Sequence, residues 1–77
     1  MSAHILSRRP CEGGVEYTVE IDIGTSFEIG TVAPHRECRD LSRWISPRLA
    51  RALGAAPNCE ALVAEIRAAI EEDQGGP

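Results

Sequence analysis

Residues 15–23, with the sequence VEYTVEIDI, alternate strictly between apolar and polar side chains over nine positions. Alternate side chains of a β-strand point to opposite faces, so this pattern predicts a strand with one buried face and one solvated face. The apolar positions are Val15, Tyr17, Val19, Ile21 and Ile23. The polar positions are Glu16, Thr18, Glu20 and Asp22. A strand with one wet face is typical of antiparallel sheets, so we expect antiparallel neighbours.

Turn-forming residues lie on both sides of this strand. PCEGG at 10–14 and GTS at 24–26 combine proline, glycine and serine, which favour tight turns. The segments beyond them, 3–8 and 27–32, are therefore predicted to be the neighbouring strands. The sequence thus predicts an antiparallel sheet of two or three strands.

The register of the second hairpin follows from its apolar residues. We expect Phe27, Ile29 and Thr31 to share the apolar face of residues 15–23. Opposed residues in a hairpin point to the same face, so the loop should hold an odd number of residues. A three-residue loop, 24–26, would pair Ile23 with Phe27 and Ile21 with Ile29.

The second half of the chain carries helical patterns. Pro34 can open a helix whose inner side is Cys38, Leu41 and Ile45. Ser46 and Pro47 match an N-cap followed by the first residue of a short second helix, which Gly54 closes. The last helix is predicted over 59–73, with Asn58 as its cap. Its buried stripe comprises Leu62, Val63, Ile66, Ala69 and Ile70.

These elements predict an α+β fold in the order β-β-β-α-α. One face of the sheet is covered by two helices, or by three short ones if the break at Ser46 divides the first. We expect one domain over residues 1–73 and a flexible C-terminal tail over 74–77. The predicted core contains Ile21, Phe27, Ile29, Leu41, Ile45, Leu62 and Ile66.

The composition indicates in which compartment the protein lies and whether its cysteines are oxidised. No apolar run approaches the roughly 18 residues of a membrane-spanning helix, and the first ten residues lack the layout of a signal peptide. We therefore expect a cytoplasmic protein, in the host cytoplasm if a phage encodes it. The three cysteines, Cys11, Cys38 and Cys59, are an odd number and are expected to stay reduced.

Charge is segregated along the chain, which has 12 acidic residues, eight arginines and no lysine, for a net charge of −4. The net charge is −3 over residues 1–33, +3 over 34–57 and −4 over 58–77. In the three-residue-loop register, one wet sheet face gathers four acids. They are Glu16, Glu20, Asp22 and Glu28. This face either keeps a small protein soluble or binds a cationic partner, of which nucleic-acid-binding proteins are the largest class.

The predicted helix at 34–45 offers an alternative surface with three arginines on its outer side and an aromatic residue at the border. These residues are Arg36, Arg39, Arg43 and Trp44. They either form a solvated, ion-paired helix face or contact phosphates, with Arg48 and Arg51 extending the stripe. The net charge of −4 and the scarcity of aromatic residues argue against nucleic-acid binding.

Catalytic and metal-binding motifs are absent from the sequence, so we expect no enzyme activity, no cofactor and no metal. Two hypotheses of lower rank stay open. His35 and Cys38 could supply two metal ligands, completed by His4, Cys11 or Cys59. Cys59, near the start of the last helix, could have a lowered thiol pKa and be redox-reactive.

A lysine-free, acidic α+β chain of this size resembles the small type I anti-CRISPR proteins. The resemblance rests on RDLSRWI at 39–45, a Gly/Pro break and the amphipathic EALVAEIRAAIEE at 60–72, over about half of the chain. It implies a stoichiometric inhibitor, often acidic, that occupies a nucleic-acid-binding surface of a CRISPR surveillance complex.

We therefore expect a small acidic protein that binds and inhibits a basic, nucleic-acid-binding protein, such as a Cas protein, through Glu16, Glu20, Asp22 and Glu28. The main alternative is a small regulatory module such as an immunity protein, an antitoxin or an accessory subunit. Binding of nucleic acid through the arginine-rich helix ranks third. We expect no membrane association and no direct nucleic-acid contact, and a homodimer is compatible with the sequence.

Overall fold

The structure is a computed structural model that describes residues 2–12, 14–35, 37–38 and 40–75. The chain forms β1 (Ala3–Cys11), β2 (Gly14–Asp22), β3 (Phe27–Val32), α1 (Leu41–Trp44), α2 (Pro47–Ala55) and α3 (Cys59–Asp73). The strands make one antiparallel sheet in the order β1-β2-β3. The predicted α+β fold, with the strands before the helices, is confirmed.

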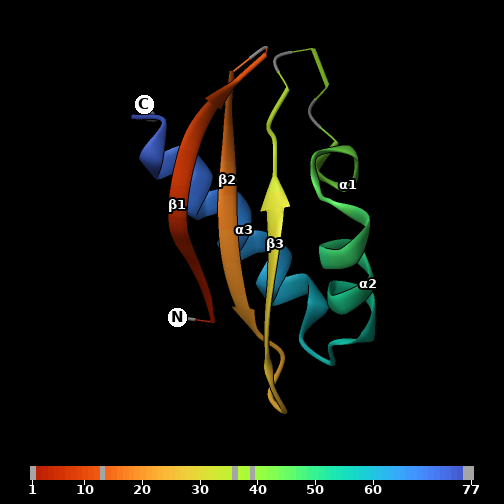
Figure 1. The fold of residues 1–77 in the computed structure, drawn as a ribbon. Helices are drawn as coiled ribbons and strands as arrows, with labels where there is room; N and C mark the ends of the chain where they lie inside the picture. Colours follow the sequence, from red (N-terminus) through yellow and green to blue (C-terminus); the bar gives the residue numbers. More distant parts are fainter. Residues whose placement is uncertain (1, 13, 36, 39, 76–77) are drawn as a thin grey trace.

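All the helices pack on one side of the sheet. In Figure 1, α3 runs behind the three strands, and α1 and α2 lie beside β3. The core between these layers is built from apolar side chains of every element. Its buried members are Ala3, Tyr17, Val19, Ile21, Val32, Leu41, Leu49, Leu53, Ala56, Leu62, Ile66 and Ile70. The opposite side of the sheet carries no helix among the described residues.

The central strand β2 has the predicted alternation. Tyr17, Val19 and Ile21 are buried, and the polar residues between them face the other side of the sheet. The edge strand β1 continues to Cys11, three residues beyond the predicted end, and Cys11 pairs with Gly14. Pro10 is tolerated there because an edge strand needs ladder hydrogen bonds on one side only.

The predicted register between β2 and β3 is wrong by one residue. Asp22 pairs with Phe27 and Ile21 with Glu28, so the hairpin loop holds four residues, 23–26. Ile23 leaves the strand and donates its N–H to the carbonyl oxygen of Ser26 (3.1 Å). Because side chains alternate, this shift moves every β3 side chain to the face opposite the predicted one.

The observed register has two packing advantages. It brings Gly30 under Leu49 of α2, where a Cβ atom would lie 2.5 Å from the Leu49 Cβ, and it buries Val32. It also replaces the like-charged pair of Asp22 and Glu28, which would destabilise the predicted register, by mixed pairs. Phe27 and Ile29, predicted to be core residues, are consequently exposed.

The predicted helix from Pro34 to Ile45 is also wrong. The Cys38 N–H donates to the His35 carbonyl (3.3 Å), and the helix begins only at Leu41. Asp40 caps it, because its carboxylate accepts a hydrogen bond from the Ser42 N–H (3.0 Å). Arg36 and Arg39 lie outside the described residues.

The remaining two helices begin where the sequence predicts, but α2 ends at Ala55, so Gly54 lies inside the helix and does not close it as predicted. Ser46 caps α2 by accepting from the Leu49 N–H (3.5 Å), and Pro47 is its first residue. The predicted bounds of α3, Cys59–Asp73, are confirmed, and Leu62, Ile66 and Ile70 are buried. Asn58 precedes α3 but makes no side-chain capping bond. None of the helices within the described ranges has the length and apolar character needed to cross a bilayer.

Candidate protein-binding surface

The side of the sheet that faces away from the helices is the candidate site, and we call it the open sheet face. The register places side chains of all three strands on it. They are His4, Ser7, Arg9, Glu16, Thr18, Glu20, Asp22, Phe27, Ile29 and Thr31. Glu16, Glu20 and Asp22 lie together on it, as the alternation predicted.

Three large apolar side chains of the sheet are exposed, and two of them, Phe27 and Ile29, lie on the open sheet face. Phe27 is 63% exposed, Leu6 51% and Ile29 47%, and no other large apolar residue of the described chain is so exposed. Leu6 stands at an irregularity in the pairing of β1 with β2, between Ile5 and Ser7. Such a concentration of exposed apolar side chains on one face is typical of an interaction surface.

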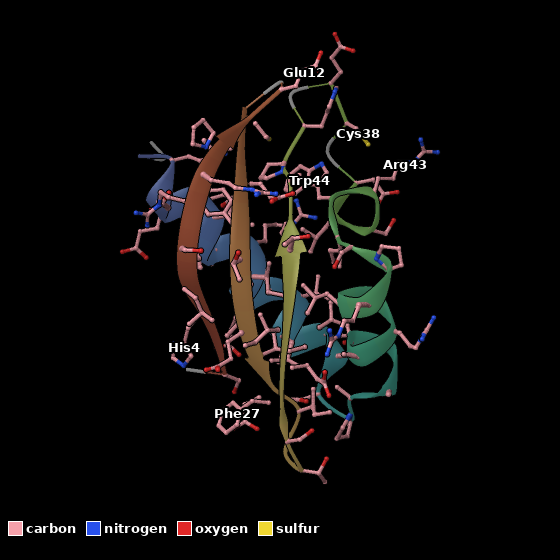
Figure 2. All side chains as sticks on the ribbon, in the orientation of Figure 1. His4, Glu12, Phe27, Cys38, Arg43 and Trp44 are labelled. Carbon is pink, nitrogen blue, oxygen red and sulfur yellow. The ribbon has the colours of Figure 1, made fainter. Side chains whose placement is uncertain are left out.

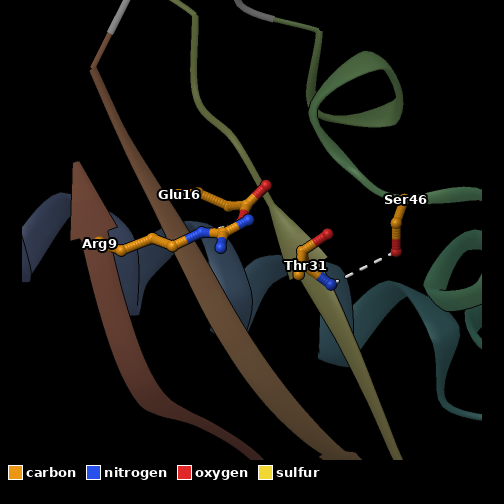
Figure 3. Close-up of polar contacts among 4 residues, drawn as sticks. All are labelled: Arg9, Glu16, Thr31 and Ser46. Carbon is orange, nitrogen blue, oxygen red and sulfur yellow. Dashed lines mark hydrogen bonds and ion pairs between the residues drawn. The ribbon is translucent and has the colours of Figure 1, made fainter. Parts of the chain in front are cut away.

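Glu16 is neutralised by an arginine of the neighbouring strand. The Arg9 guanidinium donates to the Glu16 Oε1 from Nε and from Nη2, both at 2.7 Å, as the two side chains cross the β1–β2 ladder (Figure 3). An exposed pair of this kind adds little stability. Its consequence for the site is that Glu16 offers a partner less charge than the other two acids of this face.

Glu20 and Asp22 keep their charges available. Neither forms an ion pair with any residue in the described part of the chain, and both are half-buried. Glu20 lies between His4 of β1 and Ile29 of β3, and Asp22 lies opposite Phe27. Asp22 Oδ1 also accepts a hydrogen bond from the Gly24 N–H (2.8 Å), which holds the carboxylate over the hairpin loop.

Glu28 does not belong to this surface. It pairs with the buried Ile21, so its side chain points to the helix-covered face of the sheet. The predicted patch of four acids is therefore three, with Phe27 and Ile29 where sequence reasoning placed Glu28. The cause is the four-residue hairpin loop.

The alternative surface around Arg43 and Trp44 lies away from Phe27 and His4, toward the other end of the sheet (Figure 2). Arg43 is exposed on α1. Trp44 is half-buried, donates its indole N–H to the Cys38 carbonyl (2.6 Å), and stacks under the Arg67 guanidinium, 5.8 Å from the ring centre. Trp44 is thus engaged in holding α1, whereas the Arg43 side chain stays exposed.

A groove of about 400 Å³ lies between the helices, lined mainly by apolar side chains together with Asp40, Cys59 and Arg67. The pKa of Asp40 is held below its ordinary value, because the Ser42 hydroxyl and N–H donate hydrogen bonds to it. A carboxylate stabilised in its charged form is a weak proton acceptor. Asp40 is accordingly better suited to capping α1 than to acid–base chemistry.

The metal and thiol hypotheses gain no geometric support. Across the described ranges, no three His, Cys, Asp or Glu side chains gather as a metal site would require. His35 Nδ1 accepts a hydrogen bond from the Glu37 N–H (3.2 Å) within its own turn. The thiols of Cys11, Cys38 and Cys59 are all free.

Sequence reasoning missed the apolar part of the surface. The predicted three-residue loop pairs Ile23 with Phe27, and this register puts Phe27 and Ile29 in the core. The signal that favoured the observed register was the opposition of Asp22 and Glu28 in the predicted one, since like charges rarely face each other across strands. Arg9 was missed because the predicted first strand ended at residue 8.

No protein family model, curated protein or solved structure matches this chain. The open sheet face therefore has to be interpreted from its own geometry and charge.

Proposed function

We propose that this chain is a non-enzymatic protein that binds a basic, nucleic-acid-binding protein and inhibits it. The observation that carries the proposal is the open sheet face, where the carboxylates of Glu20 and Asp22 lie beside the exposed Ile29 and Phe27. Apolar anchors next to charges that complement a partner are the usual composition of a protein interface.

The target that we propose is a protein of a CRISPR surveillance complex, in line with the resemblance of residues 39–45 and 60–72 to type I anti-CRISPR proteins. A basic surface that normally holds nucleic acid suits Glu20 and Asp22 in charge. Nucleic acid itself does not, because its phosphates would approach a face whose one arginine among the described residues, Arg9, is already paired with Glu16.

The experiment compares two double variants that change the net charge by the same amount at different places. Glu20→Arg with Asp22→Asn changes the open sheet face, and the asparagine keeps an Oδ1 acceptor for the Gly24 N–H. Glu71→Arg with Glu72→Gln makes the same change in net charge at the exposed end of α3. Both variants are tested for binding to a purified surveillance complex. A second assay measures whether each variant still prevents the complex from binding its target DNA.

We expect the affinity of the sheet variant to fall ten-fold or more and the α3 variant to bind as the wild type does. Added salt should slow the association of the wild type and of the α3 variant with the complex. Equal binding by both variants would assign the open sheet face to solubility alone. If the wild type leaves the complex active but captures a toxin or a different nucleic-acid-binding protein through the same face, the regulatory-module alternative is favoured.

A further inference from the structure

The pairing of Asp22 with Phe27 and of Glu20 with Ile29 suggests which cationic side chain the open sheet face accepts. The Asp22 N–H donates to the Ser2 carbonyl (2.8 Å), on the β1 side, so its backbone does not bond to β3. Asp22 and Phe27 therefore form a non-hydrogen-bonded pair, and two residues further Glu20 and Ile29 form another. In such pairs the side chains stand closer together than in the hydrogen-bonded ones.

This geometry makes two adjacent units, each with a carboxylate beside an apolar side chain. In the first unit, the carboxylate of Asp22 is anchored through Oδ1 and keeps Oδ2 for a ligand, next to the largely exposed ring of Phe27. In the second unit, Glu20 stands beside Ile29, which is aliphatic and offers no π face. A ligand that uses the first unit must satisfy a carboxylate and an aromatic ring at once.

An arginine side chain meets both demands. Its guanidinium is planar, weakly hydrated and rich in donors, so it can stack on an aromatic ring while donating to a carboxylate. A lysine ammonium is compact and strongly hydrated, and it gains less from the ring. We propose that the protein partner presents an arginine to Asp22 and Phe27, with a second cationic residue at Glu20; this inference rests on the proposed function.

A second copy of this chain is a poor occupant of the same face. A two-fold contact between two open sheet faces would bring two sets of Glu20 and Asp22 together, and like charges in a contact are strongly unfavourable. The nitrogen-containing basic side chains on this face within the described residues are Arg9, which is paired with Glu16, and His4. Charge complementarity thus favours an arginine-bearing partner.

The test uses three peptides, Ac-GRGRG-NH2 and its lysine and citrulline counterparts, titrated into the 15N-labelled full-length protein at 150 mM salt. We expect the arginine peptide to shift the amide resonances around Asp22 and Phe27 and to bind about three-fold more tightly than the lysine peptide, a preference of the size given by an exposed cation–π contact. The citrulline peptide, which is isosteric with arginine but neutral, should leave these resonances unchanged.

Variants at Phe27 separate the ring from simple burial. Phe27→Leu should remove the preference for arginine over lysine, and Phe27→Tyr should keep it, whereas Asp22→Asn should weaken both peptides alike. Equal binding of the arginine and lysine peptides to the wild type, or shifts confined to another surface, would overturn this inference. Equal binding at the open sheet face would still leave the proposed function standing, since that is decided by the charge variants and the purified complex.

Discussion

Leu49 of α2 packs directly over Gly30 of β3. A Cβ atom added at Gly30 would lie 2.5 Å from the Leu49 Cβ and 3.2 Å from the Ser46 Oγ. This contact fixes how closely the second helix approaches the sheet. It also requires residue 30 to face the helices, and so it links the packing of α2 to the register that exposes Phe27 and Ile29.

Gly30→Ala should therefore destabilise the protein. Replacing a strand glycine by alanine gains about 0.5–1 kcal/mol in conformational entropy, but overpacking a tight contact typically costs about 1–3 kcal/mol. The clash should win, and urea denaturation should report a net loss. Gly54→Ala is the matched control, because nothing lies within 4 Å of its added Cβ and the helix should gain about 0.5–1 kcal/mol. A Gly30→Ala protein as stable as the Gly54→Ala protein would contradict this packing.

A pair of isoleucine variants tests the register itself. Ile66 is buried in the core, so Ile66→Ala should reduce the free energy of unfolding by about 2–5 kcal/mol. Ile29 is on the open sheet face, so Ile29→Ala should change it by less than about 0.5 kcal/mol. Denaturant titration of both variants measures these values. A large loss for Ile29→Ala would support the three-residue loop instead.

Most elements could be predicted because their signals are local and repeated. The alternation over residues 15–23 spans nine positions, and the combination of Ser46 and Pro47 marks a helix start with two independent preferences. The helix of Cys59–Asp73 shows its apolar stripe over four turns. In each case several residues favour the same structure, and a single atypical position does not change the outcome.

The parity of the hairpin loop could not be predicted in this way, because it depends on one residue. Ile23 continues the apolar alternation, yet it turns out of the strand, and Asp22 and Gly24 close the loop behind it. Gly24 adopts a φ of +97°, which L-residues with side chains avoid. The choice between loops of three and four residues also depends on the packing of Gly30 against Leu49, which is distant from the loop in sequence.

The predicted start of the helix at Pro34 is wrong for a related reason. Pro34 is a good first helical residue, and the apolar spacing from Cys38 to Ile45 is helical. Asp40, however, is a strong N-cap, and its bonds to Ser42 start the helix there. The chain then leaves α1 after four residues because Ala33 and Ser46 bond to Trp44 and Thr31, which joins residues 44–46 to the edge of β3. Figure 3 shows this edge, where Ser46 Oγ also accepts from the Thr31 N–H.

The last prediction concerns Tyr17, the single tyrosine of the chain. Its pKa is raised above the ordinary value because it is buried and because the negative charge of the Asp73 carboxylate favours the protonated phenol. Gln74 and Arg8, of which Arg8 lies opposite Tyr17 in the sheet and pairs with Asp73, oppose this shift without cancelling it. Absorbance at 295 nm, which follows tyrosine ionisation, should give a midpoint above about pH 10 for the folded protein and near 10 in denaturant.

The same raised pKa determines how stability depends on pH. A group whose pKa is raised by folding keeps its proton in the native state while the unfolded chain has lost it, so the free energy of unfolding falls as pH rises. The contribution of Tyr17 to the free energy of unfolding should be intact below about pH 10, which is the pKa of tyrosine in the unfolded chain. It should be lost progressively as pH rises through the pKa of Tyr17 in the folded protein. Tyr17→Phe cannot ionise and should lack this component, so the comparison of the two proteins isolates the contribution of Tyr17. We therefore expect the stability difference between wild type and Tyr17→Phe to be constant from about pH 6 to 9 and to change in favour of the variant above about pH 10. A difference that stays constant up to about pH 11, with both proteins still folded by circular dichroism, would mean that Tyr17 ionises as freely in the native state as in the unfolded chain.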